Sequence, residues 1–117
     1  MDEQRIVASN TLAIAIHDRH PVTPLHSLVI PRRHVVDYFD LHDSEVRAIH
    51  RLIEQVRVGI VDSDSSVRAF NIGVNSGRIA GQTVLHAHVH LIPRRAGDVE
   101  NSRGGVRATI PGQADYE

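Results

Sequence analysis

Several residue classes are scarce in this sequence, and each absence excludes a class of protein. Cysteine is missing, which rules out disulfide bonds and thiolate metal sites and leaves nothing that indicates an oxidising compartment. Aromatic residues make up only 3% of the chain, so few side chains could stack single-stranded bases. No apolar run approaches the roughly 20 residues that span a bilayer, and no apolar signal region follows the polar start at 1–5. We therefore expect a cytoplasmic protein.

An excess of one charge is also absent. Lys and Arg total 13 against 14 Asp and Glu, and the net charge of −1 provides no basic field for nucleic acid or a membrane surface. A length of 117 residues suits one modest core, so we predict a single domain over 1–117, with a motif-bearing core at about 10–100 and a mobile tail at 101–117. If a chain of this size were an enzyme, its active site would use a shallow cleft or gain walls from a second subunit, which favours a homodimer.

Histidine, by contrast, occurs nine times, and three copies alternate within residues 81–94. Side chains of a strand alternate between its two faces, whereas residues two apart on a helix point in different directions. A strand would therefore present His86, His88 and His90 on one face. The opposite, core-facing side would then carry Leu85, Ala87, Val89 and Leu91.

Three alternating imidazoles are compatible with a metal site or with chemistry at phosphorus. Metal-ligand nitrogens must lie within about 2.0–2.1 Å of one point, yet the outer histidines of a regular strand are roughly 13 Å apart. Attack on phosphorus does not require the three imidazoles to converge on one point, because one imidazole attacks while its neighbours contact phosphoryl oxygens and the leaving group. We favour the second interpretation. A zinc site using His86, His88 and His26 stays open as an alternative, and a merely solvated strand face is least favoured.

The remaining pattern predicts an α+β fold. Strands are expected at 11–16, 26–31 and 67–75, the last pairing with the histidine strand as an antiparallel hairpin. A short helical or turn segment is expected at 35–41, followed by a helix that starts with Asp43 or Ser44 as N-cap. Its apolar stripe comprises Val46, Ile49, Leu52 or Ile53, Val56 and Ile60. In all, an antiparallel sheet of about five strands should carry one main helix and a short second one.

Two polar features outside the triad have two interpretations each. Asp18 follows the first expected strand and is either a turn former or a carboxylate that binds a sugar diol. Four arginines and several glycines follow Pro93. They form either a solvated tail or a flap whose arginines reach the outer phosphates of a polyphosphate or a partner subunit.

The segment His86-Ala87-His88-Val89-His90-Leu91-Ile92 resembles the histidine triad (HIT) family of nucleotide hydrolases and transferases, whose signature is His-φ-His-φ-His-φ-φ with φ apolar. The resemblance extends through 81–84, the turn at 75–77 and the block at 21–34. Leu25 departs from it, because the family often has glycine there. The short N-terminus lacks the leading segment of the Hint branch and is more similar to the fragile-histidine-triad and bacterial diadenosine polyphosphate hydrolase branch.

This resemblance implies a mechanism. His88 would be the nucleophile that attacks the α-phosphorus of a dinucleoside polyphosphate, nucleotidyl phosphoramidate or similar substrate. The nucleotidyl-histidine so formed would then be hydrolysed by water. His90 would contact the phosphoryl oxygens or the leaving group, and His86 with His26 would form a hydrogen-bonded support.

The resemblance also implies how a purine nucleotide is bound. Asn75, Gln82 and Thr83 would contact phosphate or leaving group, Asp18 would hold the ribose hydroxyls, and Ile16 would form an apolar wall near the base. Family catalysis uses no protein-held metal and no tightly bound cofactor, and any magnesium would accompany a polyphosphate substrate. Many members are homodimers whose sheets join across a two-fold axis. A non-catalytic purine nucleotide-binding regulatory module is the alternative, since fold does not guarantee turnover.

Overall fold

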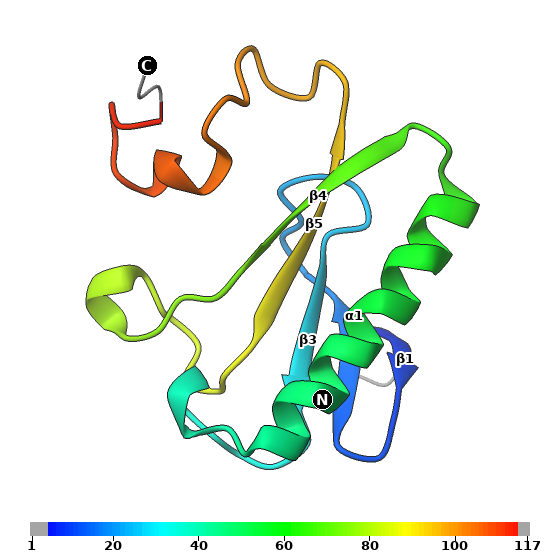
Figure 1. Cartoon of the computed structure of the whole chain (residues 1–117), viewed down its shortest axis with the longest axis vertical. Helices are drawn as coiled ribbons and strands as arrows, with labels where there is room; N and C mark the ends of the chain where they lie inside the picture. Colours follow the sequence, from blue (N-terminus) through cyan, green and yellow to red (C-terminus); the bar gives the residue numbers. More distant parts are fainter. Residues whose placement is uncertain (1–4, 115–117) are drawn as a thin grey trace.

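Five strands and one long helix form the framework of residues 5–114, the part of the chain that the computed structural model describes (Figure 1). All strand pairings are antiparallel, which confirms the predicted α+β sheet with one main helix. The elements are β1 (Ile6–Ser9), β2 (Ala13–His17), β3 (Ser27–Pro31), α1 (Asp43–Ser63), β4 (Val67–Gly73) and β5 (Val89–Arg95), with short 3-10 turns η2 (Tyr38–Asp40), η3 (Arg78–Ala80) and η4 (Gly105–Thr109).

The strand order is β1-β2-β3-β5-β4, so β5 lies between β3 and β4. The β3–β5 register places Leu28 opposite His90, and the β2–β3 register places Ile16 opposite Leu28. Paired residues on neighbouring strands point to the same face of a sheet. Ile16, Leu28 and His90 therefore form one row across three strands.

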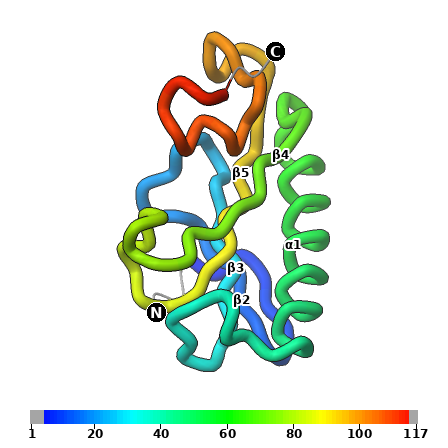
Figure 2. Tube along the Cα trace, turned by 60° about the vertical axis from the view of Figure 1, so that its left-hand side comes forward, coloured from blue at the N-terminus to red at the C-terminus, as the bar shows by residue number. Residues whose placement is uncertain are grey.

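Alternation along the strands gives the sheet two different faces. Ala13 and Ala15 are completely buried beneath α1, whereas Ile14 and Ile16 belong to a separate apolar cluster on the other face. Figure 2 shows α1 running along one side of the sheet only. Burial of each large apolar side chain between helix and sheet contributes about 1.5–3 kcal/mol. The helix side chains that fill this layer are Ile49, Leu52, Ile53, Val56 and Ile60.

The start of α1 differs from the prediction, because the N-cap is His42 rather than Asp43 or Ser44. The Glu45 carboxylate accepts a hydrogen bond from the His42 backbone N–H at 2.8 Å and is almost completely buried. Arg33 donates two further hydrogen bonds to this carboxylate, at 2.8 and 3.1 Å, and holds the pKa of Glu45 below its usual range. Val46, expected in the buried stripe, is 38% exposed.

The predicted histidine strand is too long, because β5 starts only at Val89. Residues 81–88 form a loop, and Leu85, expected on the core face, is 47% exposed. The loop is held by backbone groups elsewhere in the chain: the Ala87 N–H donates to the Val35 carbonyl at 2.6 Å. The predicted hairpin of β4 with β5 is confirmed.

Both ends of the described chain show features beyond the sequence pattern. β1 pairs with β2 at one sheet edge, in a segment for which the sequence predicted no strand. After β5 the chain forms η4, which contacts β4, while the predicted mobility of 101–117 stays a prediction. The other edge is β4, so the predicted homodimer has a free strand at which two sheets could join, and it also stays a prediction. Within residues 5–114, no helix has the length and apolarity that crossing a bilayer requires.

The Arg33–Glu45 contact should be a main support of the segment that leads into α1. Replacing Arg33 by Met leaves a buried carboxylate short of partners, so we expect Arg33→Met to lower the free energy of unfolding by about 2 kcal/mol. Arg57→Met, on the exposed face of α1, is the matched control and should change it by less than about 0.5 kcal/mol. Urea denaturation measures both, and equal losses would show that water solvates Glu45.

Candidate active site

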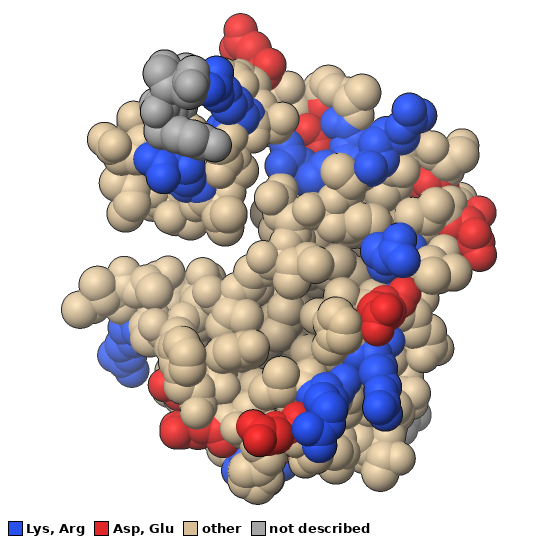
Figure 3. Space-filling model, viewed as in Figure 1, with Lys and Arg blue, Asp and Glu red and all other residues tan. Residues whose placement is uncertain are grey.

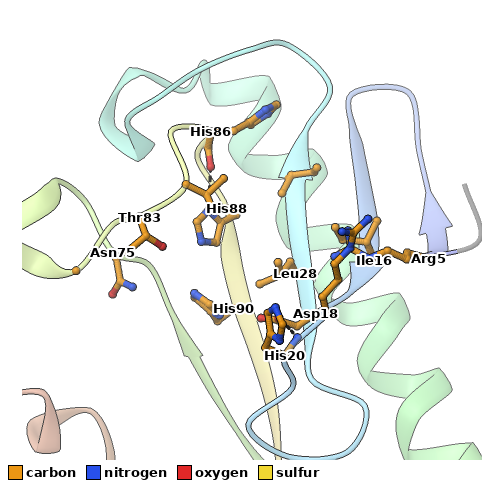
Figure 4. A pocket seen from close by; sticks show the side chains of 14 residues that line it. Arg5, Ile16, Asp18, His20, Leu28, Asn75, Thr83, His86, His88 and His90 are labelled. Atoms are coloured by element: carbon orange, nitrogen blue, oxygen red, sulfur yellow. Dashed lines mark hydrogen bonds between the residues drawn. The ribbon is translucent and has the colours of Figure 1, made fainter. Parts of the chain in front are cut away.

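A cavity of about 670 Å³ opens on the sheet face that α1 leaves uncovered (Figure 4). The row made by Ile16, Leu28 and His90 forms its floor, and the loops after β2 and before β5 form its sides. Seven of the nine predicted site residues line it: Ile16, Asp18, Asn75, Thr83, His86, His88 and His90. His26 is buried beside it, and Gln82 lies outside it.

His88 is oriented by a hydrogen bond to the backbone just before it. Its Nδ1 lies 2.8 Å from the His86 carbonyl oxygen, which can only accept. Nδ1 of His88 must therefore carry the proton, and a neutral imidazole then has its lone pair on Nε2. Figure 4 shows the ring of His88 between Thr83 and His90. His88 thus offers the cavity an unprotonated nitrogen.

His26 and His90 are neighbours whose protons are assigned by a backbone donor. The Val22 N–H donates to Nδ1 of His26 at 3.2 Å, so a neutral His26 carries its proton on Nε2. This Nε2 lies 3.0 Å from Nδ1 of His90 and donates to it. A neutral His90 therefore keeps its own N–H on Nε2. Burial is the main cause that lowers the pKa of both side chains, which favours these neutral forms.

The prediction that His86 and His26 together form a hydrogen-bonded support is wrong. Nε2 of His86 instead donates to the Pro31 carbonyl at 2.9 Å, and its ring packs edge-on against His34 with centroids 5.2 Å apart. The prediction assumed a straight strand with all three imidazoles in line. Because residues 81–88 form a loop, His86 is directed to the end of β3, and His26 pairs with His90.

Asp18 is a turn residue and a cavity residue at once. Its Oδ1 accepts the His20 backbone N–H at 2.9 Å, which closes the turn after β2. Its Oδ2 lies 3.5 Å from Nε2 of His26. The carboxylate is an acceptor that lines the cavity beside Ile16. The turn former is therefore confirmed, and the binding of a sugar diol stays a prediction.

Gln82 does not contact the cavity, which corrects its expected role. Its Oε1 accepts the Gly77 N–H at 2.9 Å, and its Nε2 donates to the carbonyls of Val36 and Val84. The side chain is buried, and backbone groups occupy both ends of its amide. Gln82 therefore holds the loop that carries Thr83 instead of binding a phosphate itself.

One set of possible metal ligands comes together within residues 5–114, namely Asp18, His26 and His90, with ligand atoms within 4.8 Å of one another. A metal-bound histidine normally donates its second ring N–H to an acceptor. At His26 the second nitrogen, Nδ1, faces the Val22 N–H, which is itself a donor. If a metal ion bound Nε2, the proton would move to Nδ1, and two N–H groups would then point at each other. This arrangement suits a shared proton better than a metal ion. The alternative zinc set with His86 is not assembled, since His86 is bonded to Pro31.

Several cavity residues were not found from the sequence. Leu28 and Ile30 belong to a strand that is apolar on both faces, so periodicity could not separate the cavity side from the core side. Arg5 and His20 also line the cavity, and the Arg5 guanidinium donates two hydrogen bonds to the His17 carbonyl, at 2.8 and 3.2 Å. The pairing of Ile16 with Leu28 identifies this wall, and that pairing is known only from the tertiary structure.

The HIT domain model matches residues 2–97 of the chain. The chain belongs to the HIT family. It is 40% identical over 87 residues to the asymmetrical bis(5'-nucleosyl)-tetraphosphatase of Schizosaccharomyces pombe, covering 74% of this chain and 47% of that protein. It is 33% identical over 98 residues to the AP-4-A phosphorylase of Mycobacterium tuberculosis, covering 83% of this chain and 50% of that one. The chain therefore spans about half the length of these two relatives.

The fold comparison agrees with the family. The structure of the C. elegans NitFhit protein superposes with a TM-score of 0.79 at 34% identity, covering 87% of this chain and 24% of that one. The resemblance read from the His86–Ile92 signature is thereby confirmed, including its fragile-histidine-triad side.

Leu25, where the family often has glycine, occupies the left-handed region with φ of 72°. This conformation costs an L-residue roughly 1–2 kcal/mol, least for Asn and most for β-branched residues. Leu25→Val should therefore lower the free energy of unfolding by about 1 kcal/mol more than Leu25→Asn. Thermal and urea unfolding compare the two variants. If residue 25 had an ordinary negative φ, Leu25→Asn would be the less stable variant. Leu25 packs against the core, and Val would keep more of that apolar contact than Asn.

Burial of His26 and His90 should make stability depend on pH. Both pKa values lie below the ordinary 6.5, so between the folded and unfolded pKa values the unfolded chain binds more protons. Stability is then complete above about pH 6.5 and falls as the pH is lowered, by up to about 1.4 kcal/mol per pH unit for each group. Urea unfolding from about pH 7 to about pH 5 should show a shallower slope in His90→Gln than in wild type. His50→Gln, an exposed control on α1, should keep the wild-type slope, and identical slopes in all three proteins would contradict this assignment.

Proposed function

We propose that this HIT domain is a nucleotide hydrolase or nucleotidyl transferase that cleaves purine nucleoside phosphates at the α-phosphorus through a covalent intermediate on His88. The observation that carries the proposal is the hydrogen bond from Nδ1 of His88 to the His86 carbonyl, because it leaves the Nε2 lone pair for the cavity. An activated nucleophile needs such an orienting acceptor at its second nitrogen.

In the first step, Nε2 of His88 forms a bond to phosphorus while the bond from phosphorus to the leaving group breaks. The phosphorylated ring becomes cationic and still carries the Nδ1 proton, which the His86 carbonyl stabilises. His90 donates a hydrogen bond from Nε2 to a phosphoryl oxygen, where negative charge accumulates. In the second step, water adds to phosphorus, the bond from Nε2 to phosphorus breaks, and a nucleoside monophosphate leaves.

The shape of the cavity supports a nucleoside as the group transferred. Ile16, Leu28 and Ile30 provide an apolar wall for a base, and the Asp18 carboxylate at its end can accept hydrogen bonds from the ribose hydroxyls. Asn75 and Thr83 on the opposite side offer short donors to phosphate oxygens (Figure 4). Relatives named as a bis(5'-nucleosyl)-tetraphosphatase and an AP-4-A phosphorylase support nucleotides as the substrate class. Any Mg²⁺ would arrive with a polyphosphate substrate.

The intermediate can be tested directly. Wild-type protein mixed with a panel of dinucleoside polyphosphates and nucleotidyl phosphoramidates should gain the mass of one nucleoside monophosphate in intact-protein mass spectrometry after an acid-free quench. His88→Ala should show no adduct and a kcat/KM lower by on the order of 10³-fold or more. It should still bind nucleotide, because the rest of the cavity is unchanged.

His50→Ala, on the exposed face of α1, is the matched histidine control and should behave as wild type. Turnover by His88→Ala close to the wild-type rate would exclude His88 as the nucleophile. Nucleotide binding by wild type without adduct or product would instead indicate a non-catalytic binding module.

A further inference from the structure

Arg5 is a cation at one end of the active-site cavity, and the proposed chemistry does not use it. It directly precedes β1, whose Ile6 pairs with Ile16 of β2, and its side chain lines the cavity. In Figure 4 it lies beside Ile16 and Asp18, on the side of the cavity away from Thr83. Arg5 therefore belongs to the end of the cavity that carries the Asp18 carboxylate.

The order of the strands separates Arg5 from the reacting histidines. His90, Leu28 and Ile16 occupy β5, β3 and β2, and neighbouring strands are about 4.8 Å apart. Ile16 is thus roughly 10 Å from His90, and Arg5 lies on the β1 side of Ile16. In the proposed binding mode the α-phosphate lies beside His88 and His90. The base, and not the phosphate, then comes next to Arg5.

One edge of the Arg5 guanidinium is fixed and another is open. Nε and Nη2 both donate to the His17 carbonyl, at 3.2 and 2.8 Å, which holds the plane of the group. A guanidinium has five N–H donors in a planar fork, so three remain. Within residues 5–114 these three have no partner. Two of them, one on Nη1 and one on Nη2, are parallel and can donate to two neighbouring acceptors at once.

A second arginine, Arg19, lines the same cavity but is not held in place. It lies in the exposed turn after β2, and its guanidinium forms no hydrogen bond or ion pair within the described part of the chain. Figure 3 shows basic and acidic side chains interspersed over the face that carries α1, in keeping with the net charge of −1. Individual contacts, and not a general basic field, therefore select a ligand. Of the two arginines, only Arg5 has an orientation fixed by hydrogen bonds.

Purine bases differ at the edge that two parallel donors would contact. Guanine presents two adjacent acceptors there, O6 and N7, whereas adenine presents N7 beside its N6 amino group, which is a donor. Arginine commonly pairs with O6 and N7 of guanine through two hydrogen bonds. Opposite adenine, one of the two N–H groups would instead point at the amino group.

We infer that Arg5 selects the base of the substrate, and that it favours guanine over adenine by donating from Nη1 and Nη2 to O6 and N7. The base lies against the apolar wall of Ile16, Leu28 and Ile30. This inference rests on the proposed function and narrows its substrate class to guanine nucleotides. Hypoxanthine carries the same two acceptors and is accepted equally.

Calorimetry with nucleoside monophosphates tests the inference without turnover. Wild type should bind GMP at least about tenfold more tightly than AMP, because a bidentate contact discriminates between bases. IMP should bind within about twofold of GMP, because it keeps both O6 and N7. 7-Deaza-GMP, which lacks N7, should bind about fivefold more weakly than GMP or worse. Equal affinities for GMP and AMP, or for GMP and 7-deaza-GMP, would overturn the inference.

Variants of the two arginines test which side chain is responsible. Arg5→Met removes the open edge and should bring the ratio of the GMP and AMP affinities to within about twofold of one. Arg5→Lys keeps the charge without the planar fork and should also lower this ratio. Arg19→Met, the matched control, removes a positive charge from the same cavity and should keep the wild-type ratio. A wild-type ratio in Arg5→Met, or a lost preference in Arg19→Met, would contradict the role of Arg5. The analogue series uses wild-type protein, so it decides the question even if loss of the His17 contact unfolds Arg5→Met.

Failure of the proposed function gives a different result. An adduct on His88 together with equal affinities for GMP and AMP removes only the base selection. Preferential binding of GMP without an adduct keeps the base selection and removes the covalent chemistry. A protein that binds none of these nucleotides removes both.

Discussion

The pairing of β3 with β5 is the constraint on which the site depends. It joins segments of the chain that α1 and β4 separate, and its register places Leu28 beside His90. Because β2 pairs with β3 in turn, Ile16 and Leu28 form an apolar wall in the same row as His90. The same pairing brings His26, just before β3, within 3.0 Å of His90. A shift by one residue would turn His90 to the helix side and dismantle both arrangements.

Two backbone groups decide the chemistry of the histidines. The Val22 N–H determines which nitrogens of His26 and His90 carry the protons. The His86 carbonyl places the proton of His88 on Nδ1, so that Nε2 keeps its lone pair. Burial keeps His26 and His90 neutral, so the site combines one free lone pair with neutral N–H donors. Such a set suits attack on phosphorus with stabilisation of developing negative charge, and it disfavours a metal ion at His26.

The other half of the cavity is held from a distance. The loop that carries Thr83 is bonded through Gln82 and Ala87 to the backbone at 35–36. That segment lies between Arg33 and Glu45, whose contact anchors it at the start of α1. Helix packing on one sheet face thus supports loop geometry on the other. His90 and Asn75 then lie between two cavities on the open face, one beside Ile16 and the other beside the C-terminal segment.

Much of this protein could be predicted from periodicity and residue chemistry, because both are local properties. The helix stripe, the β4–β5 hairpin, the α+β class and the triad signature follow from spacing, and most predicted site residues do line one cavity. Leu25 was marked as a departure from the family pattern, and the structure adds that its φ is positive, a conformation that glycine adopts more readily.

Only the tertiary structure decided the partners of these residues. β5 starts at Val89 because the preceding loop bonds to residues 35–36. His86 therefore turns to Pro31, and His26 pairs with His90. Gln82 became a loop support for the same reason. Which face of β3 lines the cavity depends on register and on contacts between distant segments. A side-chain pattern along the chain carries no information about those contacts, and they determined the site.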